Sequence, residues 1–115
     1  MINKIKSRKD FIRIQRNGKK VVSSCLIIQH LKSIDDENAT RFGFTASKKV
    51  GGAVLRNKAK RRMRSLVNEL KNIFKPHGYD YVLIARKQVV NEDYNKIKDD
   101  YHNSNNNYDD SIVIK

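Results

Sequence analysis

The chain has 115 residues, the size of one compact domain. Its 25 Lys and Arg residues outnumber its 12 Asp and Glu residues and give a formal charge of +13, so a polyanion is the first class of partner to consider. The single cysteine, Cys25, excludes an internal disulfide framework, and no apolar run has the length of a membrane span or the form of a secretory signal. We therefore expect a basic, cytoplasmic single domain with no membrane partner.

The positive charge is concentrated in two segments. Residues 1–20 contain eight Lys and Arg residues and one acid, and residues 41–71 contain ten and one. Residues 21–40 and 72–115 each carry a slight excess of acids. This asymmetry predicts one basic face, because charge that serves only solubility is spread more evenly.

The N-terminal segment predicts a short helix over residues 8–17, where apolar residues recur at helical spacing. Ser7 and Asp10 form a candidate capping box, and Gly18 is a candidate C-terminal stop. The helix is followed by residues 21–32, which are rich in β-branched and apolar side chains and predict extended chain. In a strand formed by these residues, successive side chains point to opposite faces. Leu26, Ile28 and His30 would then lie on one face, and Ile27, Gln29 and Leu31 on the other.

The acidic stretch 34–40 is expected to form a hairpin loop, and residues 41–47 alternate as a half-buried strand. In that strand we expect Phe42 and Phe44 to pack in the core rather than to serve as stacking platforms for bases.

The C-terminal third predicts a strand over residues 79–86 and a short helix over residues 91–102. The Asn- and Asp-rich residues 103–115 are expected to be a disordered tail, so the domain spans residues 1–102.

Residues 53–74 predict the most informative element, an amphipathic helix. At roughly 100° per residue, one arc of about 120° is apolar and predicts a core face: Leu55, Ala59, Met63, Leu66, Val67, Leu70, Ile73 and Phe74. The adjacent arc carries cations and amides: Asn57, Lys60, Arg61, Arg64, Asn68 and Lys71. Lys48 and Lys49 precede the helix, and Gly51 and Gly52 allow a tight turn into it.

This cationic arc is best matched to phosphate, since Lys and Arg at phosphates release condensed counterions and Arg adds bidentate geometry. Asn side chains there can donate to phosphate or ribose or read a base edge. A merely solvated helix surface usually interleaves acids for i,i+4 pairing, yet residues 41–68 contain none. RNA is favoured over DNA because no helix-turn-helix, zinc site or heptad pattern accompanies the helix.

Signals for a self-sufficient enzyme are weak, and we expect neither catalytic residues nor a metal site. The three histidines, at positions 30, 77 and 102, lack ligand spacing. The run Asp35-Asp36-Glu37 is typical of a solvated turn, and Cys25 of a small buried apolar residue. The composition indicates a binding protein.

The segment 45–64, TASKKVGGAVLRNKAKRRMR, resembles the signature of the bacterial ribonuclease P protein subunit, S-K-K-x-G-x-A-V-x-R-N-R-x-K-R-x-x-R, without gaps. The flanking Asp10-Phe11, the run 41–43 (RFG) and the run 81–87 (YVLIARK) agree in order, so the resemblance covers about residues 7–100.

The resemblance implies a small α/β (α+β) two-layer sandwich in the order α-β-β-β-α-β-α, with residues 21–32 divided into two strands and a left-handed βαβ crossover. It implies the protein subunit of an endoribonuclease that removes the 5′ leader of precursor tRNA. In that family a catalytic RNA carries the chemistry with Mg²⁺, and the protein itself holds no cofactor. The implied partners are this RNA and precursor tRNA, with no obligate protein partner.

The resemblance also implies roles for individual residues. Those that match the RNA-binding segment are Lys48, Lys49, Arg56, Asn57, Lys60, Arg61 and Arg64, and Asn68 continues the same face. Those at positions lining the cleft for the single-stranded leader are Phe11, Gln15, Lys20, Ile27, Gln29 and Thr45.

Three positions depart from the family pattern. Lys58 replaces the second Arg of Arg-Asn-Arg, and Gln15 and Gln29 stand where relatives often carry aromatic residues, which predicts weaker base stacking. Two alternatives remain from the residues alone: a structural rRNA-binding protein without a role in cleavage, and an independent protein nuclease.

Overall fold

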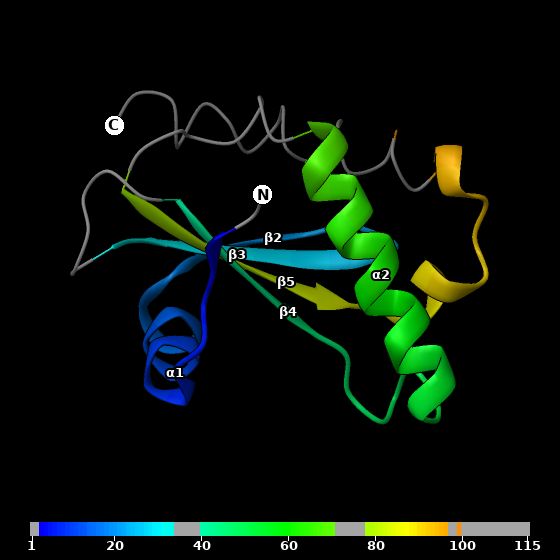
Figure 1. The fold of residues 1–115 in the computed structure, drawn as a ribbon, viewed down its shortest axis with the longest axis horizontal. Coiled ribbons are helices and arrows are strands. Elements are labelled where there is room, and N and C mark those ends of the chain that lie inside the picture. The colour runs from blue at the N-terminus through cyan, green and yellow to red at the C-terminus, as the bar shows by residue number, and fades with distance from the viewer. Residues whose placement is uncertain (1–2, 34–39, 71–77, 97–98, 100–115) are drawn as a thin grey trace.

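A five-stranded sheet organises the chain in the computed structural model, which describes residues 3–33, 40–70, 78–96 and 99 (Figure 1). In chain order the elements are β1 (Asn3–Lys4), α1 (Arg8–Asn17), β2 (Lys19–Val22), β3 (Leu26–Lys32), β4 (Arg41–Thr45), α2 (Ala53–Leu70), β5 (Tyr79–Ala85) and a 3₁₀ helix (Lys87–Val90). Residues 94–96 and 99 are helical again. The predicted α/β fold and its element order are confirmed, with the two-residue β1 and the 3₁₀ turn as additions.

The strand order is β1-β4-β5-β3-β2, which places β5 at the centre. β4 and β5 are parallel neighbours connected through α2, whereas β3 runs antiparallel to both β5 and β2. The prediction of a hairpin loop over residues 34–40 is therefore wrong, because β5 lies between β3 and β4. The largely buried, apolar β5 takes the central position, where both of its edges are paired. Residues 34–39 themselves lie outside the described residues.

The predicted extended segment 21–32 is divided into two strands by a turn, as the resemblance implied. The Ser23 hydroxyl donates to the Leu26 carbonyl at 2.8 Å, and the Leu26 N–H approaches the same hydroxyl oxygen at 3.2 Å. The first strand, β2, begins at Lys19, two residues earlier than the pattern predicted.

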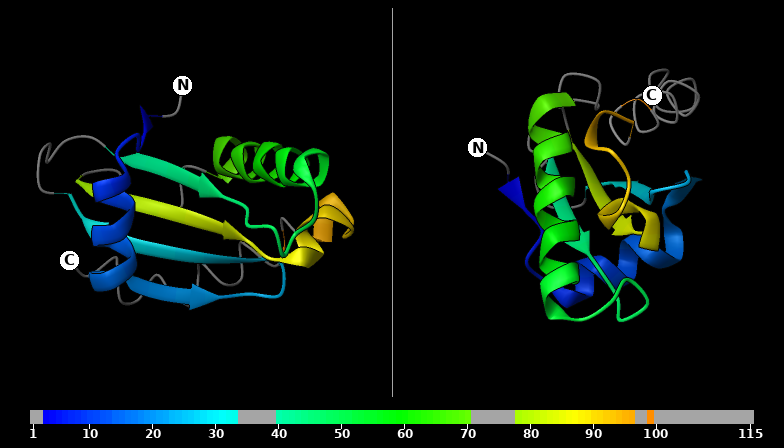
Figure 2. Two further views of the ribbon diagram at one scale, coloured as in Figure 1. Left: turned by 90° about the horizontal axis from the view of Figure 1, so that it is seen from below. Right: turned by 90° about the vertical axis from the view of Figure 1, so that its right-hand side faces the viewer.

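Two helices cover opposite faces of the sheet. α2 packs on the face formed by alternate residues of the three central strands, among them Leu26, Ile28, Phe42, Tyr81 and Leu83. α1 crosses the strands near one end of the other face (Figure 2), where Ile14 and Ile5 pack with Val82. The expectation of core packing is confirmed for Phe42, which is buried. Phe44 packs against the same cluster but remains partly exposed, so its ring is only in part a core side chain.

The α2 side of the core also contains a buried histidine. The His30 ring lies 5.7 Å from the Tyr79 ring and 5.9 Å from the Tyr81 ring, centroid to centroid. Burial, together with a smaller effect of the charge of Lys19, its register partner on β2, lowers the pKa of His30 from 6.5 to about 4. His30 is therefore a neutral core residue at neutral pH.

The ends of the predicted helices fall partly outside the described residues. α1 begins and ends as predicted, although the Ser7 hydroxyl accepts from the Lys9 N–H rather than from Asp10. Three predicted segments lie wholly or partly outside the described residues. They are the continuation of α2 to residue 74, the helix over residues 91–102 and the tail over residues 103–115. Within the described ranges, no helix combines the length and apolar character needed to cross a membrane.

Candidate nucleic-acid interface

The apolar stripe of α2 anchors the helix on the sheet. Ala59, Met63, Leu66 and Val67 are fully buried, as predicted from their spacing. Leu55 departs from the prediction because its side chain is 40% exposed. It sits in the first turn of α2 beside the preceding loop, where a Cβ on Gly51 would meet its Cδ1 at 2.5 Å, rather than over the sheet. The side chain of Leu70 and residues 73 and 74 are not described.

The cationic arc of α2 remains accessible beside this anchored stripe. Its predicted RNA-binding residues are all exposed or half-exposed: Arg56, Asn57, Lys60, Arg61, Arg64 and Asn68. No ion pair between described residues involves any of these cations. α2 has no acid in its first turn, and no described acid neutralises the cations of the arc. The arc therefore has the charge that an anion such as phosphate would require.

Arg62 belongs to the same basic run but has a different task. Its Nη1 donates to the Val89 carbonyl at 3.0 Å and to the Glu92 carbonyl at 2.6 Å. These bonds tie α2 to the 3₁₀ helix and the turn after it. Arg62 therefore stabilises the fold, and its guanidinium is engaged by these carbonyls instead of extending the cationic arc.

The loop between β4 and α2 extends the basic surface. Lys48 and Lys49 are both exposed, and the loop is ordered by a bond from the Lys49 N–H to the Ser47 hydroxyl oxygen at 3.3 Å. Gly51 has a φ of 142°, a conformation that side chains disfavour, so the predicted glycine turn is confirmed there. Gly52 shows neither a positive φ nor a close contact.

The other face of the sheet forms a floor beside α1. Strand register places Lys20, Gln29, Val82 and Gly43 in one row across β2, β3, β5 and β4. The next row on the same face consists of Val22, Ile27, Ile84 and Thr45. Among the described helices, only α1 covers this face, and it does so near one end, so that no described helix covers the second row.

A hollow of about 390 Å³ lies between α1 and this floor. Four of the six predicted leader residues line it: Phe11, Gln15, Gln29 and Thr45. The Phe11 ring lies close over Gly43, where an added Cβ would approach two ring carbons to 2.6 Å. Glycine at this position therefore makes room for the aromatic wall of the hollow.

The two remaining leader residues lie near this hollow but do not line it. Ile27 lines a neighbouring hollow of about 680 Å³, and Ile84 lines both hollows, so the two adjoin at Ile84. We call the two hollows together the groove. Lys20 pairs with Gln29 across β2 and β3 and is exposed at the edge of the floor. The structure thus brings the six residues to one sheet face, with Lys20 at its margin.

Sequence reasoning missed several residues of the groove. Lys6 and Arg8 line its first part, and Arg86 and Lys87 line its second. Lys49, which the sequence analysis placed in the RNA-binding segment and not among the leader residues, also lines the second part. The alternation of residues 79–86 does place Val82 and Ile84 on one face. Whether Val82 and Ile84 lie on the same sheet face as Ile27 and Gln29 of β3 depends on how β5 pairs with β3. The sequence does not reveal this pairing.

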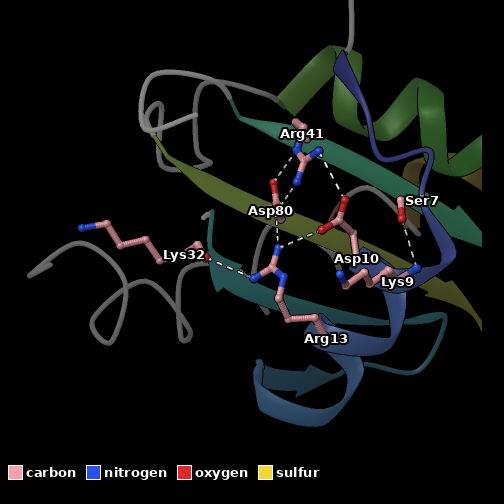
Figure 3. A network of polar contacts seen from close by, with 7 residues as sticks. All are labelled: Ser7, Lys9, Asp10, Arg13, Lys32, Arg41 and Asp80. Atoms are coloured by element: carbon pink, nitrogen blue, oxygen red, sulfur yellow. Dashed lines mark hydrogen bonds and ion pairs between the residues drawn. The ribbon is translucent and has the colours of Figure 1, made fainter. Parts of the chain in front are cut away.

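A charged network holds α1 across the sheet (Figure 3). Asp80, which is fully buried, accepts from Arg41 Nε at 2.9 Å and Nη2 at 2.8 Å, and from Arg13 Nη2 at 2.7 Å. The Asp10 carboxylate completes the network at 3.5 Å from both arginines. Arg13 belongs to α1 and Arg41 to β4, so the network sets the position of α1, and with it the wall of the groove.

The described residues offer no evident site for a metal ion. They contain no cluster of three or more His, Cys, Asp or Glu side chains. Mg²⁺ prefers carboxylate and water oxygens, but the carboxylates of Asp10 and Asp80 already face arginines.

Comparisons with known proteins agree with this geometry. The family model named Ribonuclease P matches residues 2–109. The ribonuclease P protein component of Carboxydothermus hydrogenoformans is 33% identical over 93 residues, covering 81% of this chain and 79% of the relative. That of Gluconacetobacter diazotrophicus is 40% identical over 84 residues, with coverage of 73% and 72%.

Solved structures show the same fold. The ribonuclease P protein of Staphylococcus aureus superposes with a TM-score of 0.76 at 28% identity, covering 90% of this chain and 93% of that one. The protein from Thermotoga maritima gives a TM-score of 0.73 at 28% identity, with coverage of 88% and 93%. The chain therefore belongs to the ribonuclease P protein family, the protein subunit of the endoribonuclease that processes the 5′ end of tRNA.

Proposed function

We propose that this chain binds the catalytic RNA of ribonuclease P through the cationic arc of α2 and holds the single-stranded leader of precursor tRNA in the groove beside α1. The RNA carries out the cleavage, and the protein acts in the cytoplasm by positioning the substrate. No further protein subunit is required in this arrangement.

One observation carries the proposal: the chain presents two different RNA-compatible surfaces on opposite faces of one sheet. The α2 arc is dense in cations whose charge no described acid neutralises, which suits the closely spaced phosphates of a folded RNA. The groove is lined by the ring of Phe11, by amide side chains and by cations, a combination that suits one unpaired strand.

In this proposal Mg²⁺ is held mainly by phosphates of the RNA subunit. Cations on the protein reduce the repulsion between RNA and substrate phosphates, which lowers the Mg²⁺ concentration needed for the complex to form. The gain from the protein is therefore expected to be largest at low Mg²⁺.

The test is reconstitution with a bacterial ribonuclease P RNA at low Mg²⁺, with cleavage of a precursor tRNA as the readout. The protein should raise the cleavage rate over that of the RNA alone. Phe11→Leu should reduce this gain for a substrate with a long leader and spare a substrate with a one-nucleotide leader. Arg56→Ala should reduce it for both. Cleavage no faster than with RNA alone would overturn the proposal.

The rRNA-binding alternative predicts different behaviour. A ribosomal component would sediment with ribosomal subunits, and its depletion would leave tRNA 5′ ends unchanged. An independent nuclease would cleave precursor tRNA without any RNA subunit. Sequencing of tRNA 5′ ends after depletion, together with an assay of the purified chain alone, distinguishes the three.

A further inference from the structure

A third, smaller hollow lies at the β4 edge of the sheet and shares only Phe11 with the lining of the groove. It encloses about 190 Å³ and is lined by Lys4, Ile5, Phe11, Phe42, Gly43, Phe44, Lys60 and Arg64. Phe11 comes from the α1 side of the sheet, and Lys60 and Arg64 come from the α2 side. Side chains from both faces can share one hollow only where it wraps around the free edge of a strand. We call this hollow the edge notch.

The backbone of β4 is open at the edge notch. β1 pairs only with Arg41 and Phe42, and the last bond on this side runs from the Ile5 N–H to the Phe42 carbonyl at 2.9 Å. Alternate residues of a strand direct their N–H and C=O groups to the same side, so those of Phe44 also face this edge. No described residue pairs with them there. The edge notch thus contains one free donor and one free acceptor.

The chemistry of the edge notch matches a nucleotide. The half-buried Phe44 ring offers an apolar surface, the open backbone pair can bond to the donor and acceptor on a base edge, and Lys60 and Arg64 can hold a phosphate. Pockets for drug-sized ligands span roughly 300–1,000 Å³, so this volume suits a single base. Addition of a peptide strand is disfavoured, because β4 ends at Thr45, one residue beyond the open pair.

We propose that the edge notch binds one unpaired nucleotide of RNA, with its base on Phe44 and the open edge of β4 and its phosphate on Lys60 and Arg64. The site lies between the groove and the α2 arc, so the nucleotide comes either from the leader or from the catalytic RNA. Binding of a free nucleotide does not depend on the proposed function, whereas the source of the nucleotide does.

The first experiment uses the isolated full chain and NMR titration with AMP, adenosine and inorganic phosphate at low salt. AMP should shift the amide signals of Gly43 and Phe44, and phosphate alone should shift only those of α2. Phe44→Leu should weaken AMP binding about fivefold or more, since the stacked ring is lost. Phe44→Tyr keeps the ring and should retain the affinity, and both variants should keep the phosphate response, which controls for folding.

Three results would overturn the proposal: AMP shifts confined to the groove, equal AMP affinity of Phe44→Leu and the natural chain, or preferential binding of an acidic peptide at this edge. If AMP binds as expected while the protein fails to stimulate cleavage, the edge notch stands and the proposed function falls.

The second experiment identifies the source from hydrogen exchange of the Phe44 amide in the holoenzyme. Protection by ribonuclease P RNA alone assigns the nucleotide to the catalytic RNA. Protection that appears only with a precursor tRNA carrying a long leader, and not with a one-nucleotide leader, assigns it to the leader. Absence of protection in every complex overturns the assignment to RNA.

Discussion

The two helices are both rich in arginine and lysine, yet the sheet uses their charge in opposite ways. On the α1 side, Arg13 and Arg41 are held by the buried carboxylate of Asp80. On the α2 side, the helix is held by an apolar stripe, and Arg56, Lys60 and Arg64 keep their charge available. A count of cations therefore overstates the number that are available to bind phosphate, because some of them form structural ion pairs.

The difference lies in where the acids are. Asp10 and Asp80 are distant in sequence but converge beneath α1, whereas no acid falls between residues 41 and 68. A cation beside a buried carboxylate stabilises the fold, and one without such a partner is free to bind phosphate. Three predictions test this division.

The largest expected effect concerns the α1 side. Asp80→Asn should lower the free energy of unfolding by about 3–5 kcal/mol, because it leaves two arginines largely buried beside a neutral amide. Urea denaturation measures this. Asp10→Asn is the matched control and should cost about 1 kcal/mol or less, because this carboxylate is more exposed and lies 3.5 Å from both arginines. Equal losses of unfolding free energy for the two variants would contradict the claim that the burial of Asp80 makes its ion pairs the more important ones.

The second prediction concerns the buried histidine on the α2 side. Its pKa is about 4 in the folded chain and near 6.5 when unfolded, so the unfolded state binds the proton more readily between these values. Stability should be complete above pH 6.5 and should fall with decreasing pH, by about 2 kcal/mol from pH 7 to pH 5. His30→Leu should flatten this part of the profile. The same slope in both proteins would contradict the assignment to His30.

The third prediction separates two arginines on one helix. Arg64→Ala should weaken binding to ribonuclease P RNA by about 1–3 kcal/mol and reduce its salt dependence, with little change in stability. Arg62→Ala should do the reverse: it loses the bonds to Val89 and Glu92, costs about 1–2 kcal/mol of stability, and leaves the salt slope nearly unchanged. Filter-binding titrations at several salt concentrations and urea denaturation supply both readouts. Identical salt slopes for the two variants would refute the division.

Much of the site could be predicted because it depends on short-range order. The spacing of Ala59, Met63 and Val67 specifies the buried side of α2, and the intervening cations must then face away from the sheet. The glycine turn at Gly51 is similarly local. The division of residues 21–32 into two strands was implied only by the family resemblance, because the residue pattern itself predicted one extended segment. Leu55 was wrongly predicted to be buried. It lies in the first turn of α2, and periodicity does not show whether the sheet extends far enough to cover that turn.

What the sequence alone determined was the main helices and strands, the composition of their faces and the resemblance to the family; β1 and the 3₁₀ helix were not predicted. The tertiary structure decided which elements are neighbours: β5 enters between β3 and β4, Asp80 meets Arg13 and Arg41, and β1 stops short of Phe44. The physical reason is that periodicity reports how residues within one segment are oriented. Pairing between distant strands depends on the burial and hydrogen bonding of the whole sheet.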